Sequence, residues 1–229
     1  MNFDGKQAIV TGGTGGLGRA VVSTLVDAGA RVHVPVFIEA ELEDFAFADH
    51  EAVTLHRGLD LGKEADVRAL FSAVPDLYAS IHLAGGFAFG PLKDTEQSTW
   101  DHLLRLNATT CFLCCRQAVR SFGEGPGRIV NVAARPVLVP TAQLGAYAAS
   151  KAAVAAITTT LAEELASSSI WVNAIVPSII DTPTNRTAMP DADVRDWAKP
   201  EDVAQTVAFL ASPANRVTRG ALVPVYGRG

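Results

Sequence analysis

A tyrosine and a lysine stand four residues apart in the stretch Tyr147-Ala-Ala-Ser-Lys151. In a helix, residues at this spacing share one face, so the phenol and the ammonium would lie close together. A free tyrosine has a pKa of about 10 and is a poor acid–base catalyst near neutrality, whereas a neighbouring cation favours the phenolate and lowers that pKa. The pair suggests proton transfer, although the spacing alone fits a surface contact between the two side chains equally well.

A glycine-rich segment, Thr11-Gly-Gly-Thr-Gly-Gly-Leu-Gly18, joins a short β-rich run to an apolar-periodic stretch. Glycines let the backbone turn tightly and approach a pyrophosphate, and the start of the following helix supplies unpaired N–H groups with a partial positive charge. Tight turns also use glycine. The placement of this cluster between a strand and a helix nevertheless predicts a dinucleotide site.

The choice between NAD and NADP depends on the end of the second strand. An acidic residue there usually binds the ribose 2′-hydroxyl of NAD, and a basic residue accommodates the 2′-phosphate of NADP. This chain has Val36 and Phe37 at these positions, so neither determinant is present. The loop that follows carries four acids and no Lys or Arg, which would repel a 2′-phosphate and slightly favours NAD, unless the acids simply face solvent. These acids are Glu39, Glu41, Glu43 and Asp44.

Short apolar runs typical of strands alternate along the whole chain with stretches whose apolar residues have helical spacing. This alternation predicts an α/β fold. Strands that are apolar on both faces indicate a Rossmann-type doubly wound parallel sheet of about seven strands with helices on both faces, in one domain over residues 1–229. The polar, proline-punctuated segment 184–197 departs from this rhythm and is expected to form a lid over a ligand. The expected strands are 7–11, 31–36, 53–58, 79–84, 128–133, 170–176 and 221–225, and the expected helices are 17–28, 64–74, 96–106, 108–122, 147–166 and 200–211.

Composition excludes several other classes of protein. The formal charge of −5 and the pI near 5.5 give no basic footprint for nucleic acid. No apolar run is long enough to cross a bilayer and the first residues leave no room for a signal peptide, so we expect a cytoplasmic protein. Cys111, Cys114 and Cys115 share a helical face and could in principle ligate a metal, but the spacing offers no fourth ligand. We therefore expect buried core cysteines and no metal site.

With these residues in place, the sequence resembles the short-chain dehydrogenase/reductase family along its whole length. The resemblance implies an NAD(P)-dependent oxidoreductase in which Tyr147 protonates the substrate during reduction, Lys151 lowers the tyrosine pKa and holds the nicotinamide ribose, and Asn107 supports a proton relay. It also implies a homodimer or homotetramer that pairs the helices around residues 108–122 and 148–166, a small-molecule substrate, and neither nucleic acid nor membrane as partner. The cofactor-binding residues implied are Gly12, Thr14, Gly16, Leu17, Gly18, Val36, Asp60, Leu61, Ala84, Gly85, Gly86, Tyr147, Lys151, Pro177, Ile180 and Thr182.

The chain departs from the family pattern at the catalytic serine. That serine lies thirteen residues before the tyrosine, where this chain has Ala134. Losing one hydrogen-bond donor costs about 10²–10³ in rate where charge develops on oxygen. Thr141 and Gln143 are candidate replacements. Ser178 also stands after Pro177, where the family usually has glycine.

A narrower resemblance, to dihydropteridine reductases, offers an explanation for the alanine. The segment Asp181-Thr-Pro-Thr-Asn-Arg186 with Met189, Pro190 and Trp197 resembles their corresponding segment, and these enzymes also have Ala-Gly-Gly after the fourth strand and lack the serine. A quinonoid dihydropterin is a conjugated imine on which little oxyanion forms, so a hydroxyl donor is less necessary. The alternatives are a carbonyl reductase or alcohol dehydrogenase of another substrate, and a catalytically idle nucleotide-binding sensor.

Overall fold

The computed structural model describes residues 1–228 and contains one parallel sheet of seven strands, as the alternating pattern predicts. The strand order is β3-β2-β1-β4-β5-β6-β7, so the order reverses between β1 and β4. Ligands of doubly wound sheets bind beyond the carboxyl ends of the strands at such a reversal. The strands are β1 Gln7–Thr11, β2 Arg31–Val36, β3 Val53–Arg57, β4 Leu77–His82, β5 Gly127–Val132, β6 Ile170–Pro177 and β7 Leu222–Val225.

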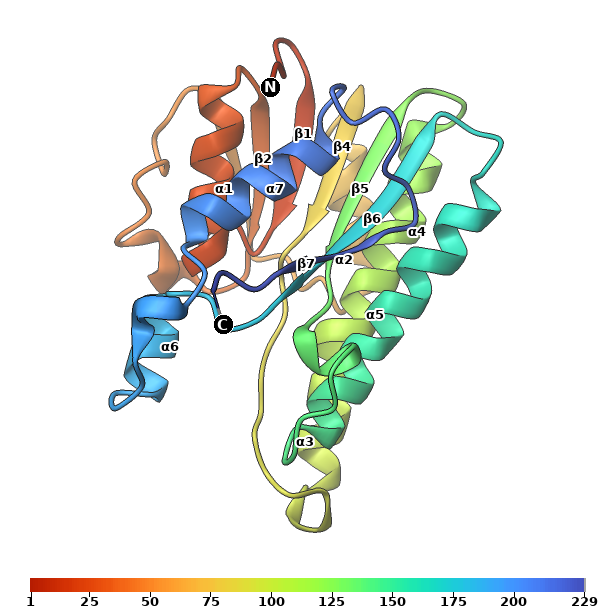
Figure 1. The fold of residues 1–229 in the computed structure, drawn as a ribbon. Coiled ribbons are helices and arrows are strands. Elements are labelled where there is room, and N and C mark those ends of the chain that lie inside the picture. The colour runs from red at the N-terminus through yellow and green to blue at the C-terminus, as the bar shows by residue number, and fades with distance from the viewer. Residues whose placement is uncertain (229) are drawn as a thin grey trace.

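Helices cover both faces of the sheet (Figure 1), and the sheet separates two hydrophobic cores. Helices α1 and α7 lie side by side over one face, while α2, α4 and α5 cover the other. The central strands β4 and β5 are buried along nearly their whole length, which explains their continuous apolar runs. The helices are α1 Gly16–Asp27, α2 Glu64–Ser72, α3 Gln97–Leu103, α4 Thr110–Phe122, α5 Gly145–Glu164, α6 Pro183–Ala188 and α7 Pro200–Ala211.

Two helices predicted as separate, residues 96–106 and 108–122, form one continuous helical segment. A π-helical stretch, Leu104–Thr109, joins α3 to α4 and contains Asn107. Neither glycine nor proline interrupts this part of the chain, so the sequence contains no signal for the irregularity. A π-bulge changes the direction of the side chains on a helix and is common at functional sites. The predicted break between the two helices is therefore wrong, and a π-helical stretch lies at its place.

Other predicted boundaries coincide with the observed ones or differ from them by one or two residues, which is the ordinary uncertainty of element ends. The predicted strand 79–84 begins and ends two residues earlier, at Leu77 and His82, which leaves Ala84 in the loop beyond the strand. The predicted helix 147–166 begins at Gly145 and ends at Glu164. No helix in the described part of the chain is long and apolar enough to cross a membrane.

The segment predicted as a lid, residues 184–197, is more ordered than its composition suggests. It contains α6 and a short 3-10 helix, Val194–Asp196. Proline occupies the first position of α6. A backbone N–H at this position would have no partner within the helix, so proline, which lacks the N–H, is well suited to it. Arg186 forms an ion pair with Asp181, and a backbone bridge joins Ile180 to Ala198 at the base of the segment.

Candidate active site

The glycine loop after β1 is too tightly packed for any other residue at two of its positions. Gly12 has a positive φ of 66°, and a Cβ there would lie 2.8 Å from the backbone nitrogen of Ala84. A Cβ at Gly18 would lie 2.0 Å from the carbonyl oxygen of Gly12. Helix α1 starts directly behind this loop with no side-chain cap and no acid in its first turn. Its N-terminus is thus arranged as a pyrophosphate site would require.

Two segments far away in the sequence lie against this loop. The backbone N–H of Ala84, after β4, donates to the Thr11 hydroxyl at 3.2 Å. A Cβ at Gly16 would lie 2.7 Å from the methyl carbon of Thr182, which is buried. Thr182 uses its hydroxyl to accept from the backbone of Asn185 and so caps α6. The loops after β1, β4 and β6 therefore converge at the reversal of strand order.

Asn107 holds the loop after β4 in place. Its Oδ1 accepts the Gly86 N–H at 2.9 Å, and its Nδ2 donates to the Gly86 carbonyl at 3.0 Å and to the Ser150 hydroxyl at 2.9 Å. Ser150 in turn donates to the carbonyl of Tyr147. Asn107 thus connects the predicted Ala84-Gly85-Gly86 motif to the start of α5. Sequence reasoning missed Ser150, whose only signal was its position between Tyr147 and Lys151.

Lys151 is buried beside the same motif. A Cβ at Gly85 would lie 3.1 Å from Lys151 Nζ and 2.6 Å from Asn107 Oδ1, so only glycine leaves room for both side chains. The ammonium donates to the carbonyl of Val132 at the end of β5, at 2.9 Å. Burial lowers the pKa of Lys151 to about 8, because the charged form loses its hydration.

Tyr147 lies one helical turn before Lys151 on α5, as the spacing predicts. Its ring meets the exposed ring of Phe87 edge-on, with the two ring centres 4.9 Å apart. The expected lowering of its pKa is wrong for this structure: burial raises the pKa of Tyr147 to about 12. The physical reason is that Lys151 directs its ammonium to Val132, while the phenol loses solvent. At neutral pH the tyrosine is therefore protonated, which is the form that a proton donor needs.

The predicted cofactor-binding residues Asp60 and Leu61 lie in the loop after β3. Arg105 forms an ion pair with the Asp60 carboxylate at 2.5 Å, and the Gly62 N–H donates to the same carboxylate. Burial by itself would raise the pKa of Asp60, but the hydrogen bonds and charges of Arg105, Gly62 and Lys63 outweigh it and lower that pKa.

The remaining predicted cofactor residues offer backbone or apolar surface. Val36 is the clearest case, because its side chain is buried in the core at the end of β2. Pro177 is buried at the end of β6, and the Ile180 carbonyl accepts a hydrogen bond from the Asn185 side chain. Leu17, Leu61 and Ile180 pack partly buried against the two cores.

The position of the family's serine, Ala134, is buried directly after β5. Neither candidate replacement turns its side chain to a partner at this site in the described structure. The Thr141 hydroxyl donates to the Val139 carbonyl, and Gln143 is exposed with a positive φ of 65° while its carbonyl accepts the Gly90 N–H. That last hydrogen bond joins the loop before α5 to the loop after β4.

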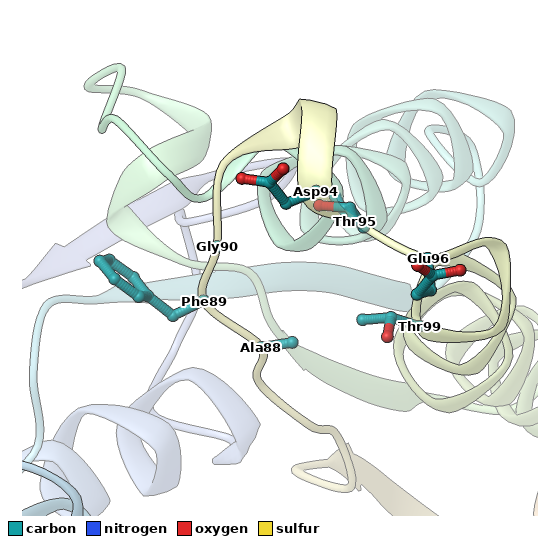
Figure 2. Close-up of a pocket in the computed structure, with 8 residues that line it drawn as sticks. Ala88, Phe89, Gly90, Asp94, Thr95, Glu96 and Thr99 are labelled. Atoms are coloured by element: carbon teal, nitrogen blue, oxygen red, sulfur yellow. The ribbon is translucent and has the colours of Figure 1, made fainter.

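A small hollow of about 120 Å³ lies between that loop and α3. Figure 2 shows its wall, formed by residues 88–90, residues 94–96 and Thr99, with the Phe89 ring turned away from Thr99. Ala146, the neighbour of Tyr147, completes the lining. The hollow is far too small for a dinucleotide.

The buried thiols meet a histidine that sequence spacing did not connect with them. The side chains of His82, Cys111 and Cys115 are buried, and their potential ligand atoms lie within 4.8 Å of one another. The two sulfur atoms are 3.9 Å apart, and Cys115 Sγ is 3.6 Å from His82 Nδ1. Three such groups satisfy the donor types of a metal site.

The hydrogen bonds around His82 occupy the nitrogen that a metal would need. The Thr158 hydroxyl donates to the Val154 carbonyl and therefore accepts from Asn131 Nδ2. This orientation directs Asn131 Oδ1 to His82 Nδ1 at 2.8 Å, so that Nδ1 carries the proton, and Nε2 accepts from the Ser80 hydroxyl. The network joins β4, β5 and α5 beneath the site and gives these buried polar groups a structural role.

The sheet topology and the convergence of these loops define a dinucleotide-binding oxidoreductase of the doubly wound α/β class. Residues 6–193 match the short chain dehydrogenase family, and the chain belongs to this family of NAD(P)-dependent oxidoreductases. Among its relatives, cis-4-hydroxycyclohexanecarboxylate dehydrogenase of Sinomonas cyclohexanicum is 34% identical, with 98% of this chain and 96% of the relative covered. D-threitol dehydrogenase of Mycolicibacterium smegmatis is 33% identical, with 99% and 94% covered.

The fold also superposes on solved structures over nearly its whole length. A short chain dehydrogenase/reductase family protein superposes with a TM-score of 0.92 at 28% identity, covering 99% of this chain and 98% of the other. A variant of actinorhodin polyketide ketoreductase, solved with NADPH, gives a TM-score of 0.87 at 26% identity, with 97% and 96% covered.

Proposed function

We propose that this enzyme reduces a conjugated ring compound, with Tyr147 as the proton donor and without a serine hydroxyl in the site. The observation that carries the role of Tyr147 is that Lys151 Nζ and Asn107 Oδ1 both lie beside Gly85, one helical turn from Tyr147 on α5. Bound NAD(P)H would supply the hydride at this point. The residues that would hold it are those of the glycine loop, with Ala84, Gly85, Gly86, Lys151 and Thr182.

At neutral pH the Tyr147 phenol is protonated and can donate a proton, as a reduction requires. Burial raises its pKa to about 12 and makes it a weaker acid, and Lys151, with a pKa of about 8, is mostly cationic at that pH. When a hydride adds to the carbon of a C=N group, the nitrogen takes the electron pair of the double bond and accepts the proton of Tyr147. The phenolate that remains regains its proton from solvent.

The absence of a hydroxyl at Ala134 supports an acceptor on which little charge gathers on oxygen. A quinonoid dihydropterin is such an acceptor. The loops at the carboxyl ends of β4, β5 and β6 present exposed apolar side chains on this edge of the sheet, which suit the faces of a flat ring. These side chains are Phe87, Phe89, Leu138, Val139 and Ile179.

The lid proposal rests on the same edge. Segment 184–197 follows Thr182, which packs on the glycine loop, and its α6 is fixed at the base by Asp181 and Asn185. We infer that the part beyond α6, with Met189, covers a bound ring while the base stays in place.

The test is turnover of NADH with quinonoid dihydropterin, comparing the wild type with Tyr147→Phe. The substitution should abolish turnover and leave nucleotide binding within about twofold, because only the phenol oxygen is removed. Tyr226→Phe is a matched control, since Tyr226 lies outside the proposed site, against Arg135. Equal turnover by wild type and Tyr147→Phe would contradict the role of Tyr147.

A second candidate is a dehydrogenase or reductase of a simple alcohol–carbonyl pair. It is favoured by the two relatives named above, whose names describe the oxidation of a hydroxycyclohexane acid and of a sugar alcohol. Turnover of simple ketones with none of dihydropterin would select it. Nucleotide binding without turnover of either class would favour the idle sensor instead.

We also infer a homodimer or homotetramer. Helix α4 exposes Phe112, and α5 carries small residues on most of its sides, so both could pack against a second copy. Light scattering at micromolar concentration checks this, and a monomeric mass would contradict it.

A further inference from the structure

The end of β2, where the family places its ribose-binding residue, offers no polar side chain to a nucleotide. Val36 is buried, and Phe37 and Ile38 beyond it are exposed and apolar. The chain then forms a short 3-10 helix, Glu39–Leu42, which directs Glu41 back to the glycine loop. The Glu41 carboxylate accepts a hydrogen bond from the Thr14 hydroxyl. An acid five residues beyond the strand thus reaches the loop that approaches the cofactor.

Arg19 on α1 fixes this arrangement. Its Nε donates to the Thr14 carbonyl at 2.7 Å, its Nη1 to the Asp44 carbonyl at 2.6 Å, and its Nη2 to the Glu41 carbonyl at 3.1 Å. The guanidinium thereby joins the glycine loop to the backbone of Glu41 and Asp44. Three of its five N–H groups are bonded to backbone carbonyls, so Arg19 holds the segment that carries Glu41 against the glycine loop.

A second cation reaches this edge from the neighbouring strand. The parallel register of β2 and β3 places Arg57 opposite Val36, next to the expected ribose position. An arginine there could attract a 2′-phosphate. Arg57, however, forms an ion pair with Glu39, and both side chains are more than half exposed. The pair reduces the positive charge that a 2′-phosphate would meet.

We propose that Glu41 is the residue that makes this enzyme select NAD(H) over NADP(H). This inference rests on the proposed function and assigns the ribose-recognition role to a position outside the strand end. A carboxylate has about four acceptor sites, so one hydrogen bond from Thr14 leaves others for a ribose hydroxyl. The same negative charge repels a 2′-phosphate in the same space.

The experiment measures dissociation constants of NADH and NADPH for the whole chain by fluorescence titration. The wild type should bind NADH at least about tenfold more tightly than NADPH, since one charge-assisted hydrogen bond is worth roughly that factor. Glu41→Gln keeps the shape and one acceptor but removes the charge. It should tighten NADPH binding about tenfold and weaken NADH binding only a few-fold.

Glu43→Gln is the matched control, because Glu43 is exposed in the same segment and should leave the NADH-to-NADPH ratio unchanged. Salt gives a second readout: the wild-type ratio should narrow between low and high ionic strength, and the Glu41→Gln ratio should change less. A wild type that prefers NADPH, or an equal ratio in wild type and Glu41→Gln, would overturn the role of Glu41. Binding of neither nucleotide would instead contradict the proposed function itself.

Discussion

The side chain of Asn107 pairs with the backbone of Gly86 through two hydrogen bonds. Its Oδ1 accepts the Gly86 N–H at 2.9 Å, and its Nδ2 donates to the Gly86 carbonyl at 3.0 Å. The asparagine reaches this position from the π-helical stretch between α3 and α4. A regular helix would rotate residue 107 relative to the loop, so the bulge is the local distortion that permits the pairing. Through this contact the loop after β4 stays fixed beside Lys151.

Replacing Asn107 by alanine should therefore affect both stability and activity. It removes the partner of both half-buried backbone groups of Gly86 and one of the two hydrogen bonds of Ser150, which should lower the free energy of unfolding by about 1–3 kcal/mol. Reductive turnover should fall as the loop loses its position. Urea unfolding and steady-state kinetics measure the two effects. Thr109→Ala, exposed in the same stretch, should change the unfolding free energy by less than about 0.5 kcal/mol. Equal stability of both variants would contradict the prediction.

The glycine loop provides a matched pair of substitutions. Gly18→Ala places a methyl group 2.0 Å from the Gly12 carbonyl oxygen, whereas Gly15→Ala places one at 3.4 Å from the same atom, an ordinary contact. We expect Gly18→Ala to weaken NADH binding more than about a hundredfold, because the backbone must move away from its pyrophosphate-binding shape. Gly15→Ala should retain binding within about tenfold. Similar titration curves for the two variants would show that the loop does not bind the cofactor.

Restoring the missing hydroxyl tests the interpretation of Ala134. Ala134→Ser should raise kcat/KM for simple ketones by about 10²-fold, since a new donor would stabilise charge on the carbonyl oxygen. The rate with quinonoid dihydropterin should change by less than about threefold, because its imine develops little oxyanion. Steady-state kinetics with both substrate classes measures this. Faster dihydropterin reduction together with unchanged ketone reduction would contradict the explanation.

Titration of Lys151 should make both the stability and the activity depend on pH. Its pKa of about 8 in the folded chain lies below the ordinary value of 10.5. The unfolded chain binds more protons between these values, so this group makes stability rise with pH from about 8 to 10.5. Reductive kcat/KM should fall over the same range as the cation is lost.

Lys151→Met removes the buried charge and should separate the two effects. At pH 7 the variant should lack turnover yet be more stable to urea than the wild type, by up to about 3 kcal/mol. That difference should shrink as the pH approaches 10.5. A difference that stays constant between pH 7 and pH 10 would show that Lys151 does not titrate in this window.

Much of the molecule is determined by local sequence. The alternating apolar runs predict a parallel sheet of about seven strands, and the structure has seven. The glycine loop and the Tyr147–Lys151 spacing are also local, because a turn or one helical turn is enough to bring their residues together. These features could be predicted since neighbours in the sequence are neighbours in space.

The tertiary structure alone decided how these pieces meet. Strand register places Arg57 opposite Val36, and the 3-10 helix brings Glu41 to Thr14. The charges near the expected ribose position therefore come from two separate segments and could not be predicted from the loop after β2 alone. Burial raised the pKa of Tyr147 where spacing to Lys151 predicted a decrease. The physical reason is the same in each case: contacts across strands and the loss of water depend on the packing of distant segments.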